Sequence, residues 1–297
     1  MLKRLISKDW YFSQTGRDFT LIDLPHDYAV TAKRSAEEPS GPSNGYYPDH
    51  NAMYIKHLSL NKDVHTILDL DGAYMNTQVF FNEHYVASHP YGYTPFLVEL
   101  TPYVLENRTN KLKITLNPFH SSCRWYTGNG IYRDVFLWEG GKVRIEPWDL
   151  FVSTVSADAA AAKLRVRFTV TADEAAKVTV RFAVLSGESC VNTKEIALNV
   201  PAGKSEHTYF IDVASPALWS IDTPNLYTLK TEILLGEALL DTSENTFGIR
   251  TVTADAENGL RINGEQVKLR GGCIHHDHGV LGAASFPAAE ERTVRLL

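Results

Sequence analysis

Four side chains able to bind metals or sugars stand side by side near the end of the sequence, at His275, His276, Asp277 and His278. Imidazoles and carboxylates are costly to bury without partners, so such a cluster is typical of a surface that meets a polar ligand. Neighbouring residues of an extended segment point to opposite faces, so one zinc ion could not take all four. We therefore expect hydrogen bonds to a ligand here, and no metal site.

The elements around this cluster indicate the opening of an α/β unit. The apolar run through Val267 and Leu269 predicts a strand, the histidine-rich segment a polar turn, and Pro287–Leu297 a helix that has only begun. Because the sequence stops at Leu297, we expect an N-terminal fragment that ends just inside a catalytic domain.

Length and composition predict about two globular domains. The chain has 297 residues, of which 44% are hydrophobic and 22% charged. A net charge of -6 and a sequence pI of about 6.0 favour neither nucleic acid nor an anionic membrane as a partner. The N-terminus is too short and too charged for a signal peptide, so we expect a cytoplasmic protein, or a secreted or periplasmic one whose leader was removed.

Three zones differ in their hydrophobic pattern. Residues 1–141 contain short alternating runs, at His65–Leu70, Thr77–Phe81, Lys111–Leu116 and Val135–Trp138. Residues 142–247 alternate more regularly, at Lys163–Val170, Lys177–Leu185, His207–Val213 and Leu226–Leu234. Period-two alternation predicts half-buried strands, so we expect a mainly β protein with a jelly-roll sandwich first and an immunoglobulin-like sandwich second. Residues 248–297 change period and contain a hairpin signal at Arg261–Gln266.

Motifs spread over nearly the whole chain resemble glycoside hydrolase family 2, the β-galactosidase, β-glucuronidase and β-mannosidase group. They occur in the family's order, as Leu24–Tyr28, Asp71–Asn82, Arg124–Val135, Leu218–Ser220 with Pro224–Tyr227, Phe247–Arg250, Ile262–Gly264 and Leu269–Gly271. Each motif alone is weak, but their order and spacing together are specific.

The resemblance implies a jelly-roll sugar-binding domain, an immunoglobulin-like domain and then the start of a truncated (β/α)8 barrel. It also implies retaining hydrolysis by two glutamates about 5–5.5 Å apart. In the family both come from later barrel strands, and Glu265, Glu290 and Glu291 match neither. We therefore expect a β-galactosidase-like hydrolase that needs no cofactor, while residues 1–297 alone are inactive.

The resemblance also implies which residues contact the sugar. His275 matches a family position just after the first barrel strand, and Asp277 shares its face if the segment is extended. Arg124 and Trp125 match a loop that reaches the barrel mouth, where they either bind sugar or pack an interface. His276 and His278 are expected to be structural or to face solvent.

Two other roles stay open: a stand-alone carbohydrate-binding module, and a scaffold that makes homo-oligomer contacts. We further expect residues 248–297 to be disordered, docked irregularly on the second sandwich, or paired with another chain. An isolated first barrel strand lacks its neighbours, and an unpaired edge finds another edge or loses order.

Overall fold

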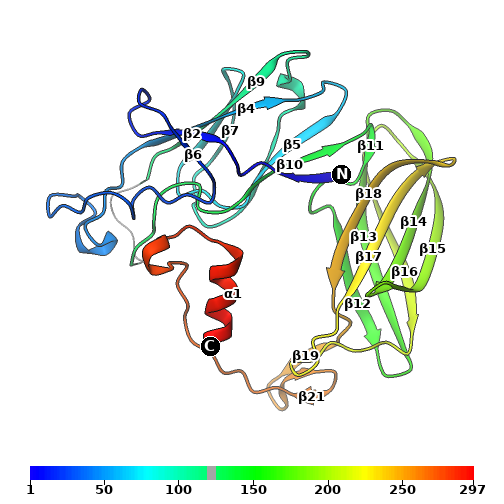
Figure 1. Ribbon diagram of the computed structural model, residues 1–297. Coiled ribbons are helices and arrows are strands. Elements are labelled where there is room, and N and C mark those ends of the chain that lie inside the picture. The colour runs from blue at the N-terminus through cyan, green and yellow to red at the C-terminus, as the bar shows by residue number, and fades with distance from the viewer. Residues whose placement is uncertain (119–124) are drawn as a thin grey trace. The chain divides into compact units, whose positions relative to one another are not determined.

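The computed structural model describes residues 1–118 and 125–297, and in these residues the chain consists mainly of β-strands (Figure 1). The prediction of a mainly β protein is confirmed. No helix among the described residues is long and apolar enough to cross a membrane. The chain divides into two compact units: a first unit of Lys3–Glu139 with Cys273–Leu297, and a second unit of Met1–Leu2 with Gly140–Gly272.

Two sheets form most of the first unit. One has six strands in the order β3-β2-β4-β9-β6-β7 and the other has four in the order β1-β10-β5-β8. The strands of the six-stranded sheet are β2 (Trp10–Ser13), β3 (Thr20–Ile22), β4 (Ala52–Ser59), β6 (Thr77–Phe81), β7 (His84–His89) and β9 (Thr109–Leu116). Those of the four-stranded sheet are β1 (Leu2–Leu5), β5 (His65–Leu70), β8 (Phe96–Glu99) and β10 (Val135–Gly140). Short 3-10 turns η1 (Gly41–Asn44) and η2 (Thr101–Tyr103) lie between strands. The four strands predicted in this zone are confirmed.

The two sheets of the first unit pack on one core, because alternate side chains of each strand face inward. On β9, Leu112, Ile114 and Leu116 are buried while the residues between them are partly exposed. Tyr54 of β4 and Leu68 of β5 join the same apolar cluster from the two sheets. Each such side chain contributes roughly 1.5–3 kcal/mol by leaving water.

The second unit contains two further sheets around a separate core. In the first, β13 (Ala161–Ala172) pairs with β11 (Val143–Arg144), β12 (Leu150–Ala157) and β16 (Gly203–Ala214). The second has the order β15-β14-β17-β18, with β14 (Ala176–Ser186), β15 (Ser189–Val200), β17 (Tyr227–Leu235) and β18 (Ala238–Phe247). The four predicted runs fall within β13, β14, β16 and β17, apart from Leu226, so these predictions are confirmed.

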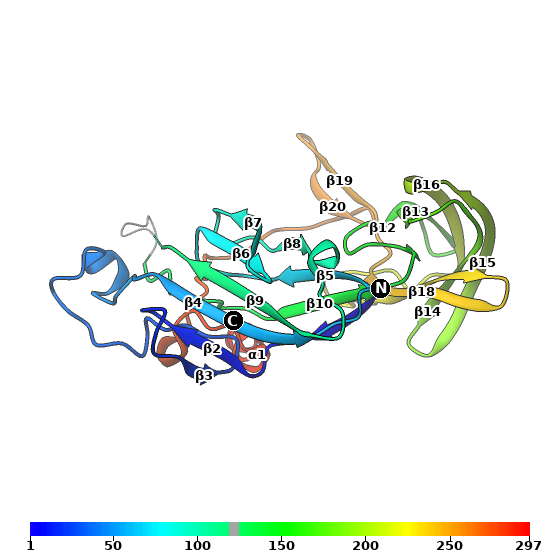
Figure 2. The ribbon, with the colours of Figure 1, turned by 90° about the horizontal axis from the view of Figure 1, so that it is seen from above.

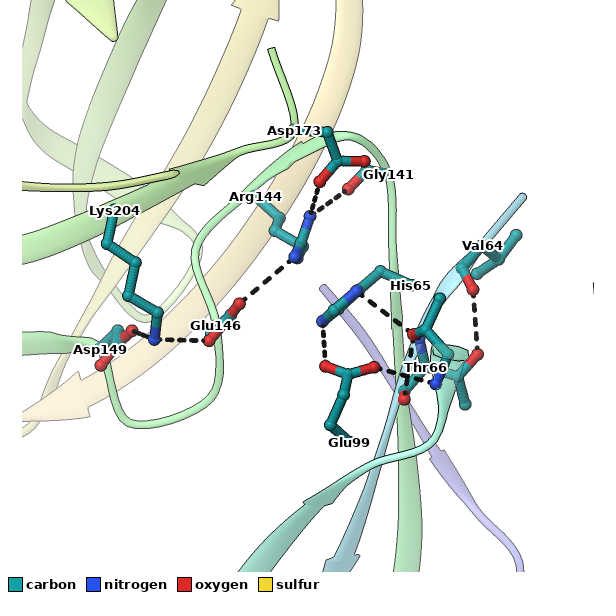
Figure 3. Close-up of polar contacts among 11 residues, drawn as sticks. Val64, His65, Thr66, Glu99, Gly141, Arg144, Glu146, Asp149, Asp173 and Lys204 are labelled. Atoms are coloured by element: carbon teal, nitrogen blue, oxygen red, sulfur yellow. Dashed lines mark hydrogen bonds and ion pairs between the residues drawn. The ribbon is translucent and has the colours of Figure 1, made fainter. Parts of the chain in front are cut away.

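A buried ion pair ties together the start of the second unit. The Arg144 guanidinium is 4% exposed and donates to an Asp173 carboxylate oxygen at 2.9 Å (Figure 3). It also lies 3.4 Å from Glu146, which in turn accepts from Lys204 at 2.8 Å. A buried charge is tolerated only when paired in this way, so the network fixes the turn at Glu146 on β13 and β16.

Three of the family-like motifs meet at Trp219 in the second unit. The Trp219 amide donates to the Ile249 carbonyl at 2.9 Å, and the Asn263 side chain donates to the Trp219 carbonyl at 3.0 Å. The Arg250 guanidinium lies 4.4 Å from the indole centroid. A Cβ on Gly248 would come within 2.9 Å of the same indole, so only glycine fits there.

A small sheet of β19 (Val252–Asp255), β20 (Gly259–Ile262) and β21 (Glu265–Gln266) follows, and it confirms the predicted hairpin. Asn263 and Gly264 form its turn with φ of 52° and 81°, the left-handed values of a two-residue hairpin turn. The predicted strand through Val267 and Leu269 is absent, since residues 267–278 contain no strand. A barrel strand is held by its neighbours, so this stretch alone has no ladder to join.

The C-terminal segment, Cys273–Leu297, packs in the first unit and ends with η3 (Gly279–Leu281) and helix α1 (Pro287–Leu296). The helix, red in Figure 1, confirms the predicted start of a helix. The prediction that this part docks irregularly on the second sandwich or is disordered is wrong for Cys273–Leu297, which is ordered within the first unit, while the alternative of pairing with another chain stays a prediction. Its backbone amides find buried acceptors in loops of the first unit, as described next.

Candidate functional site

A buried carboxylate, Asp27, joins three segments of the first unit. Its Oδ1 accepts hydrogen bonds from the backbone amides of Ala29 at 3.0 Å and Asn129 at 3.1 Å. Its Oδ2 accepts from the Tyr126 hydroxyl at 2.7 Å and the Ala283 amide at 2.8 Å. Four donors around one carboxylate that is 3% exposed compensate for its removal from water. Asp27 therefore holds the C-terminal segment against the loop at residues 126–129.

Two glycines let the chain approach this carboxylate. A Cβ at Gly282 would lie 2.3 Å from Asp27 Oδ2, and one at Gly128 would lie 2.3 Å from the Ala283 Cβ. Both have left-handed φ, 60° at Gly282 and 64° at Gly128, which other residues adopt at a cost. Any other residue at either position would push the two segments apart.

Tyr126 serves as a permanent donor in this arrangement. Burial and the charge of Asp27 raise the pKa of its phenol far above the usual value, so the hydroxyl keeps its proton. The charge of Asp277 adds to the same rise, so this carboxylate lies within electrostatic reach of Tyr126.

His276 is a structural residue, as predicted. Its Nε2 lies 2.9 Å from the Thr127 carbonyl, to which the ring N–H donates. The imidazole also contacts the rings of Tyr93 and Tyr132, at centroid distances of 5.3 Å and 5.8 Å. The Ser285 amide donates to the Tyr132 carbonyl at 2.9 Å, a second backbone link between the segment and the same loop.

His278 contacts another residue of the C-terminal segment, so it is structural, one of the two roles predicted for it. Its Nε2 lies 3.1 Å from a Glu290 carboxylate oxygen of α1. That oxygen accepts from the Ser285 hydroxyl at 2.6 Å. Burial works to raise the pKa of the Glu290 carboxyl, but the hydrogen bonds from Ser285 and His278 outweigh it and lower that pKa. The helix is thus fixed to the turn before it.

Three of the predicted ligand-binding residues, His275, Asp277 and Trp125, lie within the described part of the chain. His275 is exposed and its imidazole makes no hydrogen bond to another described residue, and the half-buried Asp277 carboxylate likewise accepts none from the described chain. Trp125 is 54% exposed, with its indole edge close to Gly45. Arg124 lies outside the described residues.

Metal-capable groups converge elsewhere in the described chain. Glu38, Asp49 and His50 have ligand atoms within 4.8 Å of one another, whereas the four residues at 275–278 do not form such a group. His276 and His278 are already engaged by protein partners. His275 and Asp277 can therefore form hydrogen bonds with a polar ligand, and the Trp125 indole can stack on it.

Sequence reasoning missed the anchor itself. Asp27 and Tyr126 belong to motifs that the sequence analysis identified, but their contact with Gly282–Ala283 was not predicted. Ala283 lies 256 residues after Asp27 in the chain. A usable signal was present: a single acidic residue within the apolar run Leu24–Tyr28 needs several donors if it is buried.

Comparison with known proteins assigns this arrangement to a class. The sequence model for "Glycosyl hydrolases family 2" matches residues 143–250. A β-galactosidase of Bacteroides ovatus is 37% identical over 290 residues, covering 94% of this chain and 34% of the relative. A putative β-glucuronidase of Formosa agariphila is 30% identical over 279 residues, covering 92% of this chain and 27% of the relative.

Solved structures of the same family superpose on this chain. The crystal structure of a glycosyl hydrolase family 2 member from Bacteroides cellulosilyticus superposes with a TM-score of 0.94 at 31% identity, covering 100% of this chain and 41% of that chain. The chain belongs to glycosyl hydrolase family 2, as its motifs predicted. It spans between about a quarter and a third of the length of the curated relatives named above.

Proposed function

We propose that these residues are the sugar-binding and scaffold portion of a retaining β-glycosidase that removes terminal β-linked galactose. The observation that carries this proposal is the 37% identity to the Bacteroides ovatus β-galactosidase over 94% of this chain. The proposed architecture is a jelly roll for the first sandwich, an immunoglobulin-like second sandwich, and the entry of a (β/α)8 barrel in residues 248–297.

In this proposal the chain positions sugar and supplies no catalytic carboxylate. His275 and Asp277 hydrogen-bond ring hydroxyls, and Trp125 with Arg124 bounds the subsite by stacking and charge. The two family glutamates belong to later barrel strands, one acting as acid/base and one as nucleophile. No cofactor is needed for that chemistry, and the protein acts in the cytoplasm unless a leader directs it outward.

The test is the rate at which the whole gene product hydrolyses nitrophenyl β-galactoside and nitrophenyl β-glucuronide. We expect a higher kcat/KM for the galactoside, with proton NMR showing the β-anomer as the first product. A preference for the glucuronide would instead support the second candidate, a β-glucuronidase, which the identity to the Formosa agariphila protein favours. If neither is cleaved while glycans still bind, the protein is a non-catalytic carbohydrate-binding or oligomerisation module.

A further inference from the structure

A cavity of about 370 Å³ lies over the six-stranded sheet of the first unit, away from the core side. It falls in the size range of small-ligand pockets, roughly 300–1,000 Å³. Its lining consists of Gln14, Thr15, Gly16, Asn51, Ala52, Met53, Asn76, Gln78, Thr115, Leu116 and Asn117. None of the residues described around the Asp27 anchor belongs to it.

The floor of the cavity is a row of side chains from β6, β9 and β4. Figure 2 shows these three strands next to one another. Gln78 is opposite Thr115, and Thr115 is opposite Met53. On each strand an adjacent residue points the other way, into the core. These residues are Val79, Ile114 and Tyr54, and all three are fully buried. Because alternate residues face opposite sides, the row is held at the surface by the core beneath it.

A hydrogen-bonded turn and a hydrogen bond between two separate segments form the walls of the cavity. In the turn, the Ser13 hydroxyl accepts from the amides of Thr15 at 3.2 Å and Gly16 at 2.9 Å, which fixes the position of Gln14. On the other wall, the Asn76 side chain donates to the Asn117 carbonyl at 2.9 Å. The cavity is therefore shaped before any ligand arrives, which lowers the entropic cost of binding.

The described residues of the lining are uncharged and rich in carboxamides. They include two glutamines, three asparagines and two threonines, and none of these described residues is acidic or basic, in a chain with 29 Lys and Arg and 35 Asp and Glu. The side chains of Gln14, Asn51 and Gln78 make no hydrogen bond to another described residue, so their donors and acceptors face the cavity or solvent. Each carboxamide offers both a donor and an acceptor, as sugar hydroxyls do.

Further along, the same face of the sheet carries charged side chains. On β9, Lys111 pairs with Glu83 at 3.0 Å, and the Lys113 ammonium lies 4.1 Å from the Phe80 ring centroid. The charges end where the cavity begins, at Thr115. The change from charged to carboxamide side chains on one face points to a neutral ligand.

We propose that this cavity binds a neutral saccharide, with the carboxamides hydrogen-bonding its hydroxyls and Met53 packing on a C–H face of the ring. The site requires no hydrolysis and does not depend on the proposed β-galactosidase activity. It would bind a neutral glycan chain to the first sandwich independently of hydrolysis.

The experiment measures binding of residues 1–297 to galactotriose, xylotriose and mannotriose, with trigalacturonic acid as the charged comparison, by saturation-transfer NMR and calorimetry. We expect at least one neutral trisaccharide to bind and the acid to bind more weakly. Gln78→Ala and Asn51→Ala should each weaken that binding about three- to tenfold, as loss of one or two hydrogen bonds predicts. Thr115→Trp should abolish it by filling the cavity.

The matched control is Asn199→Ala, which removes an exposed strand carboxamide outside the cavity and should leave binding unchanged. All four variants change side chains at the surface, so equal unfolding midpoints establish that they are folded. Absence of binding by every neutral trisaccharide, tighter binding of the acid, or binding that the cavity variants do not weaken would each overturn the proposal. Hydrolysis by the gene product is assayed separately, so its failure leaves this result intact.

Discussion

At the scale of single residues, the first unit separates side chains that hold the structure from those that remain free. His276 and His278 have protein partners, while neighbouring His275 is exposed. A residue without a structural task can be changed without unfolding the chain, which makes its role in ligand binding directly testable.

We expect His275→Ala and Asp277→Ala to lower kcat/KM of the gene product on its preferred glycoside about 10- to 100-fold, because each loses a hydrogen bond to the sugar that is made in the transition state. The unfolding midpoint should stay within a degree or two of the unchanged protein. His84→Ala, at another exposed histidine of the first unit, serves as the control. Unaltered kinetics in both site variants would remove these residues from the subsite.

His26 gives the chain a pH-dependent stability. Burial lowers the pKa of its imidazole from 6.5 to about 4, although the charge of Asp27 acts in the opposite direction. The unfolded state therefore takes up a proton between pH 6.5 and 4 that the folded state does not. Stability conferred by neutral His26 is complete above pH 6.5 and is lost as the pH falls toward 4, by on the order of 2–3 kcal/mol.

Chemical denaturation at several pH values measures this effect. Replacing His26 by Gln keeps a hydrogen-bonding group near the Tyr54 hydroxyl, which lies 2.9 Å from His26 Nδ1, but cannot titrate. The slope of unfolding free energy between pH 6.5 and 4 should become shallower in the variant. An unchanged slope would place the titration elsewhere.

At the scale of elements, the anchored C-terminal segment is the feature that propensity alone would not produce. Helix α1 has ten residues, a length that is marginal in isolation. It is ordered through the turn before it, which Asp27 and Tyr132 hold by accepting the amides of Ala283 and Ser285.

We expect Asp27→Asn to release this segment. An amide nitrogen in place of one carboxylate oxygen cannot accept both the Tyr126 hydroxyl and the Ala283 amide, so buried donors lose partners at about 1–3 kcal/mol each. Hydrogen exchange at Ala283 and Ser285 should accelerate strongly, while that of the β13–β16 pairing in the second unit should not change. Asp18→Asn, at an exposed position, is the control, and equal exchange in both variants would contradict the anchoring role.

At the scale of the whole molecule, the arrangement of domains in family 2 predicts that residues 1–297 have no catalytic activity by themselves. We expect residues 1–297 not to hydrolyse nitrophenyl β-galactoside or β-glucuronide above background, because the family resemblance implies that both catalytic glutamates lie on later barrel strands and Glu265, Glu290 and Glu291 match neither position. The gene product provides the positive comparison. Turnover by residues 1–297 that survives purification and disappears on mutating one of their carboxylates would defeat this expectation.

The sequence by itself predicted eight of the strands (β5, β6, β9, β10, β13, β14, β16 and β17), the hairpin and the family. Alternating hydrophobicity is a local property, so the runs at His65–Leu70 and Thr77–Phe81 predicted β5 and β6 with their observed ends. The turn at Asn263–Gly264 was equally readable, because only left-handed φ closes such a hairpin. The motif order sufficed for the family because it spans nearly the whole chain.

Only the tertiary structure decided where the C-terminal segment lies and what holds it. The predicted strand at Val267–Leu269 failed because a ladder needs neighbours that pattern alone cannot supply. The meeting of Asp27 with Ala283 depends on contacts 256 residues apart and on two glycines that leave room for them. The carboxamide cavity depends likewise on the register that sets Gln78 beside Thr115 and Met53. Such long-range contacts arise when the whole chain packs, so a local signal such as Asp27 can indicate that a buried group needs partners but not which residues supply them.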